Sequence, residues 1–260
     1  MVDTRVRLVE ENLLSQFELV AETPHVTRLP DEDVIAFHRD IDFPLFNFIG
    51  GARFAPGTGA DRARELIAGF VARGHPFLWW ATPSTITPDV DAALRASGIE
   101  PSPEPGMHRT LDGSIEPGDS PPGLVVKETA ATPVFVDVMS RGFGFPDFVR
   151  APLQAAFGDL PPAQVLHVLA TLGGEPVACG SGFLSGPGLA TLGIYNIATL
   201  PHARRRGIGR VVTGELMRLG REHGCTDAVL MASAMGRPTY DRLGFVEVCQ
   251  TPQYVWMPGG

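Results

Sequence analysis

The chain has 260 residues, enough for one large or two ordinary domains, and its formal net charge is −8 at pH 7. This acidic balance excludes the broad basic face that binds nucleic acid without sequence preference. No run of about 20 apolar residues predicts a membrane span, and the first residues lack the pattern of a secretory signal, so we expect a cytoplasmic protein.

Cysteine and histidine usage predicts neither disulfides nor a metal site. Cys179, Cys225 and Cys249 are far apart, odd in number and set in apolar or strand-like surroundings. We expect them to be buried thiols in a reducing compartment. The seven histidines form no HxxxH pair and no CxxC pair accompanies them, so no metal is expected.

The first half of the chain alternates helical and strand-like segments. Apolar residues from Val6 to Phe17 recur with helical spacing and predict a helix that ends before Thr23. Short apolar segments fill residues 25–54, and one reads as a strand after Pro44. We then expect a helix over 60–73, an aromatic strand over 77–82 and a short helix that Gly98 ends, which indicates an α/β or α+β module.

Residues 100–123 are dense in proline and glycine, and only Met107 to Leu111 could pair as a strand there. Such composition is typical of a domain boundary. We therefore predict a junction near Ser120, with one domain over 1–119 and another over 120–260.

The second half predicts a mixed sheet. The strand over 190–200, the helix over 207–223 and the strand over 227–232 form a βαβ unit, which makes that strand pair parallel. A ligand is expected at the carboxyl ends of these strands. The other expected strands lie over 124–128, 165–172, 176–184 and 245–257. The other expected helices lie over 132–141 and 237–243, and a further helical segment ends near residue 157.

The turn between that strand and that helix carries three consecutive arginines, Arg204 to Arg206, followed by Gly207 and Gly209. Cations are unfavourable at the start of a helix, and each glycine costs roughly 1 kcal/mol there relative to alanine. Both features suit a bound polyphosphate, because the first helical turn offers unpaired N–H groups. A solvated basic turn is the alternative.

Two common phosphate motifs do not fit this turn. The dinucleotide fingerprint needs a third glycine where Val212 stands, and the P-loop needs a Gly-Lys-Ser/Thr sequence that the chain lacks.

The segment Arg204–Gly209 instead resembles the R/Q-x-x-G-x-G/A signature of the GCN5-related N-acetyltransferases, the GNAT family. Pro238–Phe245, a predicted helix with a tyrosine that ends in Leu-Gly-Phe, is similar to that family's second signature. The resemblance covers residues 123–257. More faintly, the first half resembles the degenerate module of tandem members, because it lacks the glycine signature.

The resemblance implies an α+β protein with two GNAT-like modules. Each would be a mixed, mostly antiparallel sheet flanked by helices, with one central βαβ crossover in the C-terminal module and no cofactor in the N-terminal one. It also implies acetyl-CoA as co-substrate. The implied cofactor-binding residues are Asn196, Ile197, Ala198 and Thr199 on the strand, and Arg204, Arg205, Arg206, Gly207, Ile208, Gly209 and Arg210 at the turn.

The implied reaction is direct acetyl transfer to a primary amine of a small molecule. Tyr240 is the candidate general acid, since a phenol is matched to an alkyl thiolate, and a core tyrosine is the alternative. Many relatives carry a glutamate on the fourth strand, but residues 193–199 contain no carboxylate. The open candidates for orienting water or accepting the proton are Tyr195, Asn196, His167, His202 and Asp147.

The missing carboxylate leaves three options: a water relay, an acceptor that arrives neutral, or an acyl-CoA-binding regulatory module without turnover. The phenylalanines of the loop after residue 141, Phe143, Phe145 and Phe148, suit either an aromatic lid over an acceptor with apolar bulk or simple packing on the sheet. The acidic balance favours a cationic amine. The expected partners are this amine and a possible second copy of the chain, with no nucleic acid and no membrane.

Overall fold

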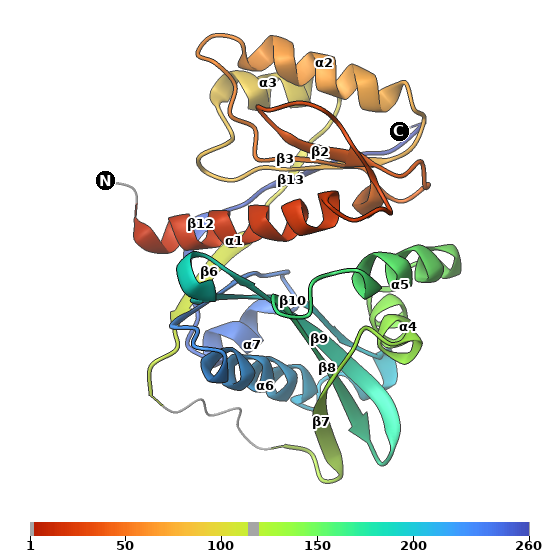
Figure 1. The fold of residues 1–260 in the computed structure, drawn as a ribbon, viewed down its shortest axis with the longest axis vertical. Coiled ribbons are helices and arrows are strands. Elements are labelled where there is room, and N and C mark those ends of the chain that lie inside the picture. The colour runs from red at the N-terminus through yellow and green to blue at the C-terminus, as the bar shows by residue number, and fades with distance from the viewer. Residues whose placement is uncertain (1–2, 114–119, 260) are drawn as a thin grey trace. The chain divides into compact units, whose positions relative to one another are not determined.

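The computed structural model describes residues 3–113 and 120–259 (Figure 1). The chain divides into two compact units. Unit 1 consists of Met1–Leu13 and Gly106–Val248, and unit 2 consists of Leu14–Pro105 and Cys249–Gly260. The long helix α1 (Thr4–Ala21) therefore contributes its first residues to unit 1 and the others to unit 2.

Within the described residues, unit 1 is built on a seven-stranded sheet of order β12-β6-β11-β10-β9-β8-β7. The pairs β7–β8, β8–β9, β9–β10 and β11–β6 are antiparallel, whereas β10 and β11 are parallel. The strands are β6 (Pro105–Thr110), β7 (Leu124–Thr129), β8 (Val165–Leu172), β9 (Glu175–Ser185), β10 (Thr191–Thr199), β11 (Asp227–Met231) and β12 (Val246–Gln250).

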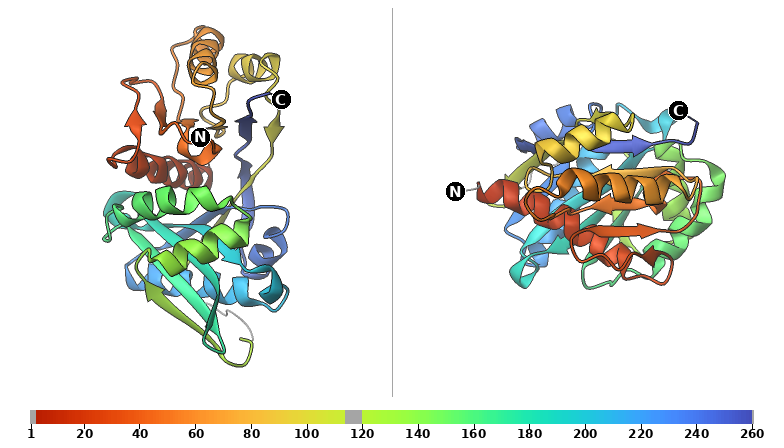
Figure 2. Two further views of the ribbon diagram at one scale, coloured as in Figure 1. Left: turned by 90° about the vertical axis from the view of Figure 1, so that its right-hand side faces the viewer. Right: turned by 90° about the horizontal axis from the view of Figure 1, so that it is seen from above.

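Helices cover both faces of this sheet (Figure 2). On one face, Leu166 and Val168 of β8 join the core with Val212 of helix α6 (Ile208–Glu222). Neighbours on a strand point to opposite faces, so His167 lies on the other face, where Phe135 of helix α4 (Pro133–Phe143) contacts it. Helices α5 (Arg150–Gly158) and α7 (Arg237–Arg242) also belong to this unit.

Unit 2 has a six-stranded sheet of order β1-β2-β3-β4-β13-β5 within the described residues. Helix α2 (Gly59–Val71) connects two parallel strands, β3 and β4. An aromatic core that includes Phe70, Phe77 and Trp79 fills the unit. Its strands are β1 (Thr27–Arg28), β2 (Ile35–His38), β3 (Phe48–Gly50), β4 (Phe77–Trp80), β5 (Pro101–Ser102) and β13 (Gln253–Trp256). Helix α3 (Pro88–Ala96) also belongs to this unit.

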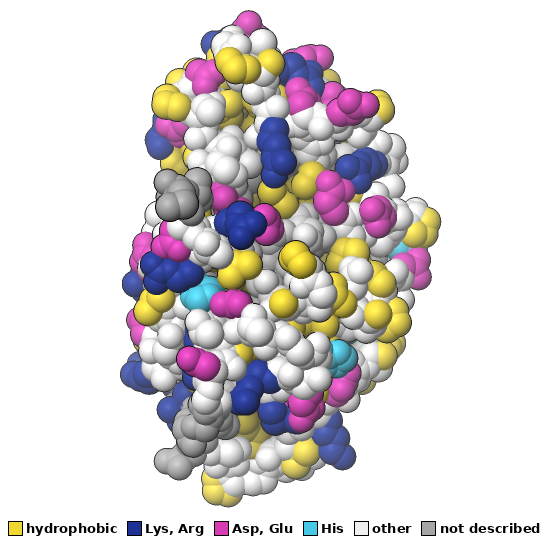
Figure 3. Space-filling view, turned by 60° about the vertical axis from the view of Figure 1, so that its left-hand side comes forward, with side chains coloured by type: hydrophobic (Ala, Val, Ile, Leu, Met, Phe, Trp, Pro, Cys, Tyr) yellow, Lys and Arg dark blue, Asp and Glu magenta, His cyan; other side chains and the backbone are white. Residues whose placement is uncertain are grey.

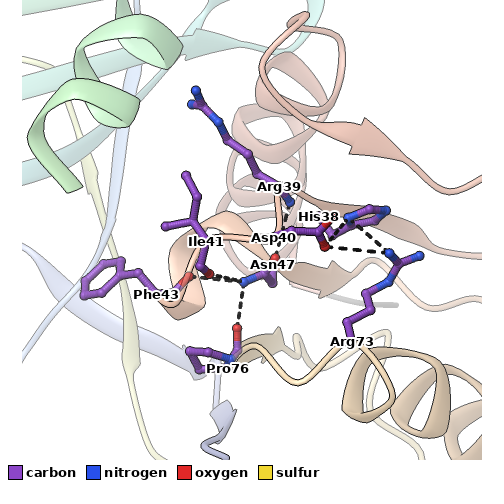
Figure 4. Close-up of polar contacts among 8 residues, drawn as sticks. All are labelled: His38, Arg39, Asp40, Ile41, Phe43, Asn47, Arg73 and Pro76. Atoms are coloured by element: carbon purple, nitrogen blue, oxygen red, sulfur yellow. Dashed lines mark hydrogen bonds and ion pairs between the residues drawn. The ribbon is translucent and has the colours of Figure 1, made fainter. Parts of the chain in front are cut away.

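Asn47 fixes the connection between β2 and β3 (Figure 4). Its buried Nδ2 donates to the carbonyl oxygens of Ile41 at 2.9 Å and Pro76 at 2.8 Å, and its Oδ1 accepts from the Arg39 N–H at 3.3 Å. Buried polar groups are costly unless they are paired, so this side chain specifies the loop conformation. Asn47 therefore acts as a structural residue of unit 2.

The two units differ from the contiguous domains predicted over 1–119 and 120–260. That junction lies at the edge of residues 114–119, which are outside the described residues. β6 comes before the junction but pairs with β11 over five residues, and its Met107 is buried in the core of unit 1. β13 comes near the end of the chain but pairs with β4, and its Tyr254 is buried in unit 2. Each apolar strand completes a sheet outside its own half of the sequence.

The predicted fold class is confirmed. Both sheets are mixed and mostly antiparallel, both are flanked by helices, and β10, α6 and β11 form the central crossover of unit 1. No helix among the described residues is long and apolar enough to cross a membrane.

Candidate active site

The parallel pair β10–β11 opens toward its carboxyl end. Within the described residues the two strands pair only at Thr191↔Asp227, Leu192↔Ala228 and Gly193↔Val229. Beyond Gly193, the edge of β10 that faces β11 runs on to Thr199 without a partner strand. An unpaired strand edge offers N–H and C=O groups to an extended ligand.

A β-bulge lies on this open part of β10. Opposite β9, Tyr195 pairs with Ser181 and Ala198 pairs with Cys179, so Asn196 and Ile197 together oppose Gly180. Asn196 has a φ of 56°, in the left-handed region that asparagine tolerates better than most residues. A Cβ at Gly180 would lie 2.6 Å from Ile197 Cδ1 and 2.9 Å from Val212 Cγ1, so side chains of the bulge and of α6 fill the space beside this glycine.

Tyr195, on one side of the bulge, is anchored to α1. Its hydroxyl donates to Asn12 Oδ1 at 2.8 Å, and the Asn12 Nδ2 donates to Phe183 O at 3.0 Å and Ser185 Oγ at 2.7 Å. Burial raises the pKa of Tyr195. The Tyr195 hydroxyl, considered from the sequence as a group that orients water, is thus engaged inside the unit.

Asn196, the next residue, is held by a side chain of β9. Its Nδ2 donates to Ser181 Oγ at 3.3 Å, and Ser181 Oγ lies 3.0 Å from Nδ1 of the buried His167. Burial lowers the pKa of His167 to about 4. His167 is therefore neutral at pH 7, and Asn196 joins it through one hydroxyl group.

The basic turn leads from β10 into α6. Arg205 and Gly207 have positive φ values of 62° and 79°, which lets the chain reverse before the helix begins at Ile208. The N–H groups of Arg210 and Val211 donate to Gly207 O at 3.1 and 3.2 Å. The N–H groups that precede them lie at the open, positive end of the helix.

The side chains around this helix end fit an anionic ligand. Arg205, Arg206 and Gly207 are exposed. The Nε of Arg210 is buried without a hydrogen-bond partner among the described residues. A buried unpaired guanidinium nitrogen is costly, and an anion at the turn would satisfy it.

Arg204 behaves differently from its two neighbours. Its Nε donates to Thr199 O at 3.0 Å and its Nη2 donates to Gly142 O at 2.7 Å. The guanidinium that was expected to face the ligand is thus engaged on two carbonyl groups, and it ties the end of β10 to the end of α4.

Tyr240 lies on α7, which follows the carboxyl end of β11. The side chain is 8% exposed and belongs to the core beside α6. Its ring meets Phe245 edge-on at 6.1 Å, and a Cβ at Gly236 would lie 2.9 Å from its Cε2. The ring therefore has a packing role. The helix that carries it, α7, follows β11 at the end where the β10–β11 pair opens.

The other candidate bases lie on the surface. Asp147 is exposed and 2.9 Å from Arg150, and His202 is exposed and 3.4 Å from Glu175. The structure thus brings neither of them into the β10–β11 opening.

The phenylalanine loop begins where α4 contacts β10. A Cβ at Gly142 would lie 2.8 Å from Ala198 Cβ, so the end of α4 touches the strand directly. Phe143 and Phe145 stack with centroids 5.3 Å apart, and Phe143 and Phe148 are 47% and 53% exposed. Large exposed aromatic side chains next to a site are typical of contact with an apolar ligand group.

Unit 2 contains a second crossover, β3–α2–β4, but its helix end is already capped. Asp89 Oδ2 accepts from the Ala60 N–H at 3.1 Å, and a Cβ at Gly59 would lie 2.5 Å from that oxygen. A hydrogen bond from Thr87 is the main cause that lowers the pKa of Asp89. The start of α2 thus carries an anion from the chain itself, where α6 carries none.

Thiols and candidate metal ligands add no further chemistry to the described part of the chain. Burial raises the pKa of Cys179 to about 12 and that of Cys225 to about 11, which disfavours their reactive thiolate forms. In residues 3–113 and 120–259, no three His, Cys, Asp or Glu side chains gather as a metal site. On the face drawn in Figure 3, acidic and basic side chains are interspersed.

Comparisons with known proteins agree with this geometry. A sequence model described as "Acetyltransferase (GNAT) family" matches residues 137–245, which include the bulge, the basic turn and Tyr240. No curated protein matches the chain.

Several solved structures share the fold over nearly the whole chain. A GCN5-related N-acetyltransferase from Kribbella flavida has a TM-score of 0.70 at 18% identity and covers 98% of this chain and 96% of its own. One from Sphaerobacter thermophilus has a TM-score of 0.62 at 15% identity, covering 95% and 84%. A tandem GNAT protein from the clavulanic acid biosynthesis pathway has a TM-score of 0.62 at 11% identity, covering 98% and 94%. At these identities the likeness shows the fold of both units.

Proposed function

We propose that the chain transfers an acetyl group from acetyl-CoA to a primary amine of a small molecule, because residues 137–245 match the sequence model of the GNAT acetyltransferase family. The observation that carries the proposal is the unpaired edge of β10, which leads directly to the open start of α6. An extended chain that ends in a pyrophosphate suits this combination of strand edge and helix end.

The residues present fit acetyl-CoA, which supplies a thioester when bound. Exposed Arg205 and Arg206 would face its phosphates, and Arg210 would gain a partner for its buried Nε. The N–H groups from Arg206 to Gly209 would donate to the pyrophosphate. The backbone from Asn196 to Thr199 would bind the pantetheine as a neighbouring strand would.

Transfer needs a polarised carbonyl group and a proton for the departing thiolate. The β10 backbone near Ile197 would donate to the carbonyl oxygen, because the bulge turns this part of the strand out of the regular ladder. Tyr240 would hold the proton at Oη and deliver it to the sulfur. Both groups come from the carboxyl ends of β10 and β11.

The amine would either lose its proton to a water relay or arrive already neutral. Residues 193–199 hold no carboxylate, and the side chains of Tyr195 and Asn196 are engaged within the unit. Without a dedicated base, the pH dependence of kcat/KM should follow the pKa of each acceptor amine. An apparent pKa that stays constant across amines would instead indicate a base on the enzyme.

The acceptor is proposed to be a cationic amine with apolar bulk. Stacked Phe143 and Phe145 offer an aromatic surface beside β10, and the net charge of −8 attracts cations. A phenethylamine-like compound should therefore react faster than an amino sugar of similar size.

An acyl-CoA-binding module without turnover is the second candidate, favoured by the missing carboxylate on β10. Thiol release from acetyl-CoA across a panel of amines separates the two functions. A matched variant, Gly207→Val, should abolish CoA binding and release because its φ of 79° excludes a branched residue. Tight CoA binding by the natural chain with no acetylated amine would refute the enzyme proposal.

A further inference from the structure

A short hydrogen-bonded chain runs from the interior of unit 1 to the bulge of β10. His167 on β8, Ser181 on β9 and Asn196 on β10 occupy three neighbouring strands on the face opposite α6. The steps are 3.0 Å from His167 Nδ1 to Ser181 Oγ and 3.3 Å from Ser181 Oγ to Asn196 Nδ2. It joins a buried histidine to the strand segment proposed above to bind the pantetheine.

The direction of these hydrogen bonds follows from their chemistry. The Asn196 amide nitrogen can only donate, so Ser181 Oγ accepts from it. The Ser181 hydroxyl is fully buried and still carries one proton, which needs an acceptor. Neutral His167 provides one at Nδ1, so its proton resides on Nε2.

His167 is itself held firmly. Its ring lies 4.7 Å from the ring of Phe135 on α4 and 5.7 Å from that of Phe157 on α5. These contacts come from two helices, so Nδ1 has a fixed position relative to the sheet. An apolar residue would fill this site without the cost of burying a polar ring.

Asn196 needs such support because its backbone conformation is unfavourable for a residue with a side chain. Its φ of 56° persists only where the surroundings specify it. Its carbonyl oxygen also accepts a weak hydrogen bond from Cys179 Sγ at 3.8 Å. Side chain and backbone of Asn196 are therefore both tied to β9.

We propose that His167 is a positioning residue, which acts through Ser181 to hold Asn196 in its left-handed conformation and thereby sets the bulge that orients the thioester. This role rests on the proposed function for its catalytic consequence. His167 touches neither substrate in this assignment. Its removal should therefore impair the chemical step and leave the proposed phosphate-binding turn at residues 205–210 intact.

Three variants of the full chain test the role. Ser181→Ala removes the linking hydroxyl, and His167→Phe keeps a planar ring but removes the acceptor. His167→Asn places an amide oxygen near the position of Nδ1 and should restore the link. His108→Gln is the matched control, because His108 is also buried in this sheet but contacts Asp227 at 2.7 Å, at the other end of β11.

Two measurements follow on each folded variant. Ser181→Ala and His167→Phe should each lower kcat about tenfold, with the Kd for CoA within about twofold of the natural value, whereas His167→Asn should recover most of kcat. Amide hydrogen exchange over residues 196–198 should speed up in the same two variants and not in His108→Gln.

The exchange measurement decides the positioning role even if no amine is ever acetylated. Unchanged exchange over 196–198 in Ser181→Ala would overturn the proposal. An equal loss in His108→Gln, or a failure of His167→Asn to restore kcat and exchange, would also overturn it, because the effect would then come from general destabilisation. Absence of turnover in the natural chain would instead refute the proposed function alone.

Discussion

Arg204 Nη2 donates to Gly142 O at 2.7 Å, across two elements that are distant in the sequence. The same guanidinium donates through Nε to Thr199 O at 3.0 Å. The first arginine of the basic turn thus links the last turn of α4, which carries Phe143, to the end of β10. The loop proposed to face the acceptor and the strand proposed to bind the cofactor share this contact.

Arg204→Ala should lower the free energy of unfolding by about 1–3 kcal/mol, because two carbonyl groups lose a charged donor. Arg205→Ala and Arg206→Ala should leave stability nearly unchanged, since both side chains are exposed. These two variants should weaken CoA binding roughly threefold each, and the weakening should shrink at high salt. Urea unfolding and CoA titration measure the two effects.

Arg204→Lys is the matched control for charge. A lysine cannot span both carbonyl groups with a rigid fork, so it should recover only part of the lost stability. If Arg204→Ala were as stable as the natural chain but bound CoA poorly, the Arg204 guanidinium would belong to the CoA-binding turn.

Tyr240→Phe should lower kcat about 100-fold with little change in the Kd for CoA, if the hydroxyl supplies the proton to the thiolate. The phenylalanine keeps the edge-on contact with Phe245, so the free energy of unfolding should change by only about 1 kcal/mol. Steady-state kinetics and CoA titration measure the split.

Tyr254→Phe is the control for this substitution, because Tyr254 is buried in unit 2 and donates to Asp91 at 2.6 Å. It should lower stability and leave kcat unchanged. Full activity in Tyr240→Phe would return Tyr240 to a packing role in the core.

Much of the fold could be predicted because local signals were strong. Helical spacing and a stop glycine defined α2, and the strand, basic turn and amphipathic helix defined the β10–α6–β11 crossover. The exchange of β6 and β13 between the sheets could not be predicted. Strand pairing depends on which buried strand edge is available in three dimensions. The local sequence around Met107 or Tyr254 does not show which strand each segment pairs with.

The backbone geometry of the basic turn was easier to predict than the contacts around it. Gly207 has a φ of 79°, a backbone requirement that a glycine makes visible in the sequence. The Asn12–Tyr195 contact spans 183 residues, and Ser181 gave no signal as the link between His167 and Asn196. The contacts of Arg204 with two backbone carbonyl groups were not predictable, because a row of three arginines does not show which one turns inward.

Stability should fall in mild acid through His167. Its pKa is lowered from 6.5 to about 4 by burial, so between these values the unfolded chain binds a proton that the folded chain does not. The stabilisation is complete above the unfolded pKa and declines as the pH falls toward 4, by about 3 kcal/mol in total. Urea unfolding at pH 7 and at about pH 4.5 measures this loss.

His167→Phe isolates the contribution of this residue, because the other titrating groups are the same in both proteins. The variant should lose about 2 kcal/mol less than the natural chain between these two pH values, because pH 4.5 is still above the folded pKa of about 4. Equal losses in the two proteins would show that folding does not lower the pKa of His167.

CoA should bind with a single site per chain, because Asp89 already caps the start of α2 in unit 2. The carboxylate accepts from the Ala60 N–H and would repel a phosphate at the position that corresponds to the basic turn of unit 1. Asp89→Ala should lower the Tm through loss of this cap. The variant should still bind one CoA, since unit 2 has no row of arginines that could bind a phosphate.

Isothermal titration gives the CoA stoichiometry of both proteins. A second equivalent of CoA on the natural chain would contradict the assignment of unit 2 as free of cofactor, whereas a second equivalent on Asp89→Ala alone would show that one carboxylate is enough to close that helix end.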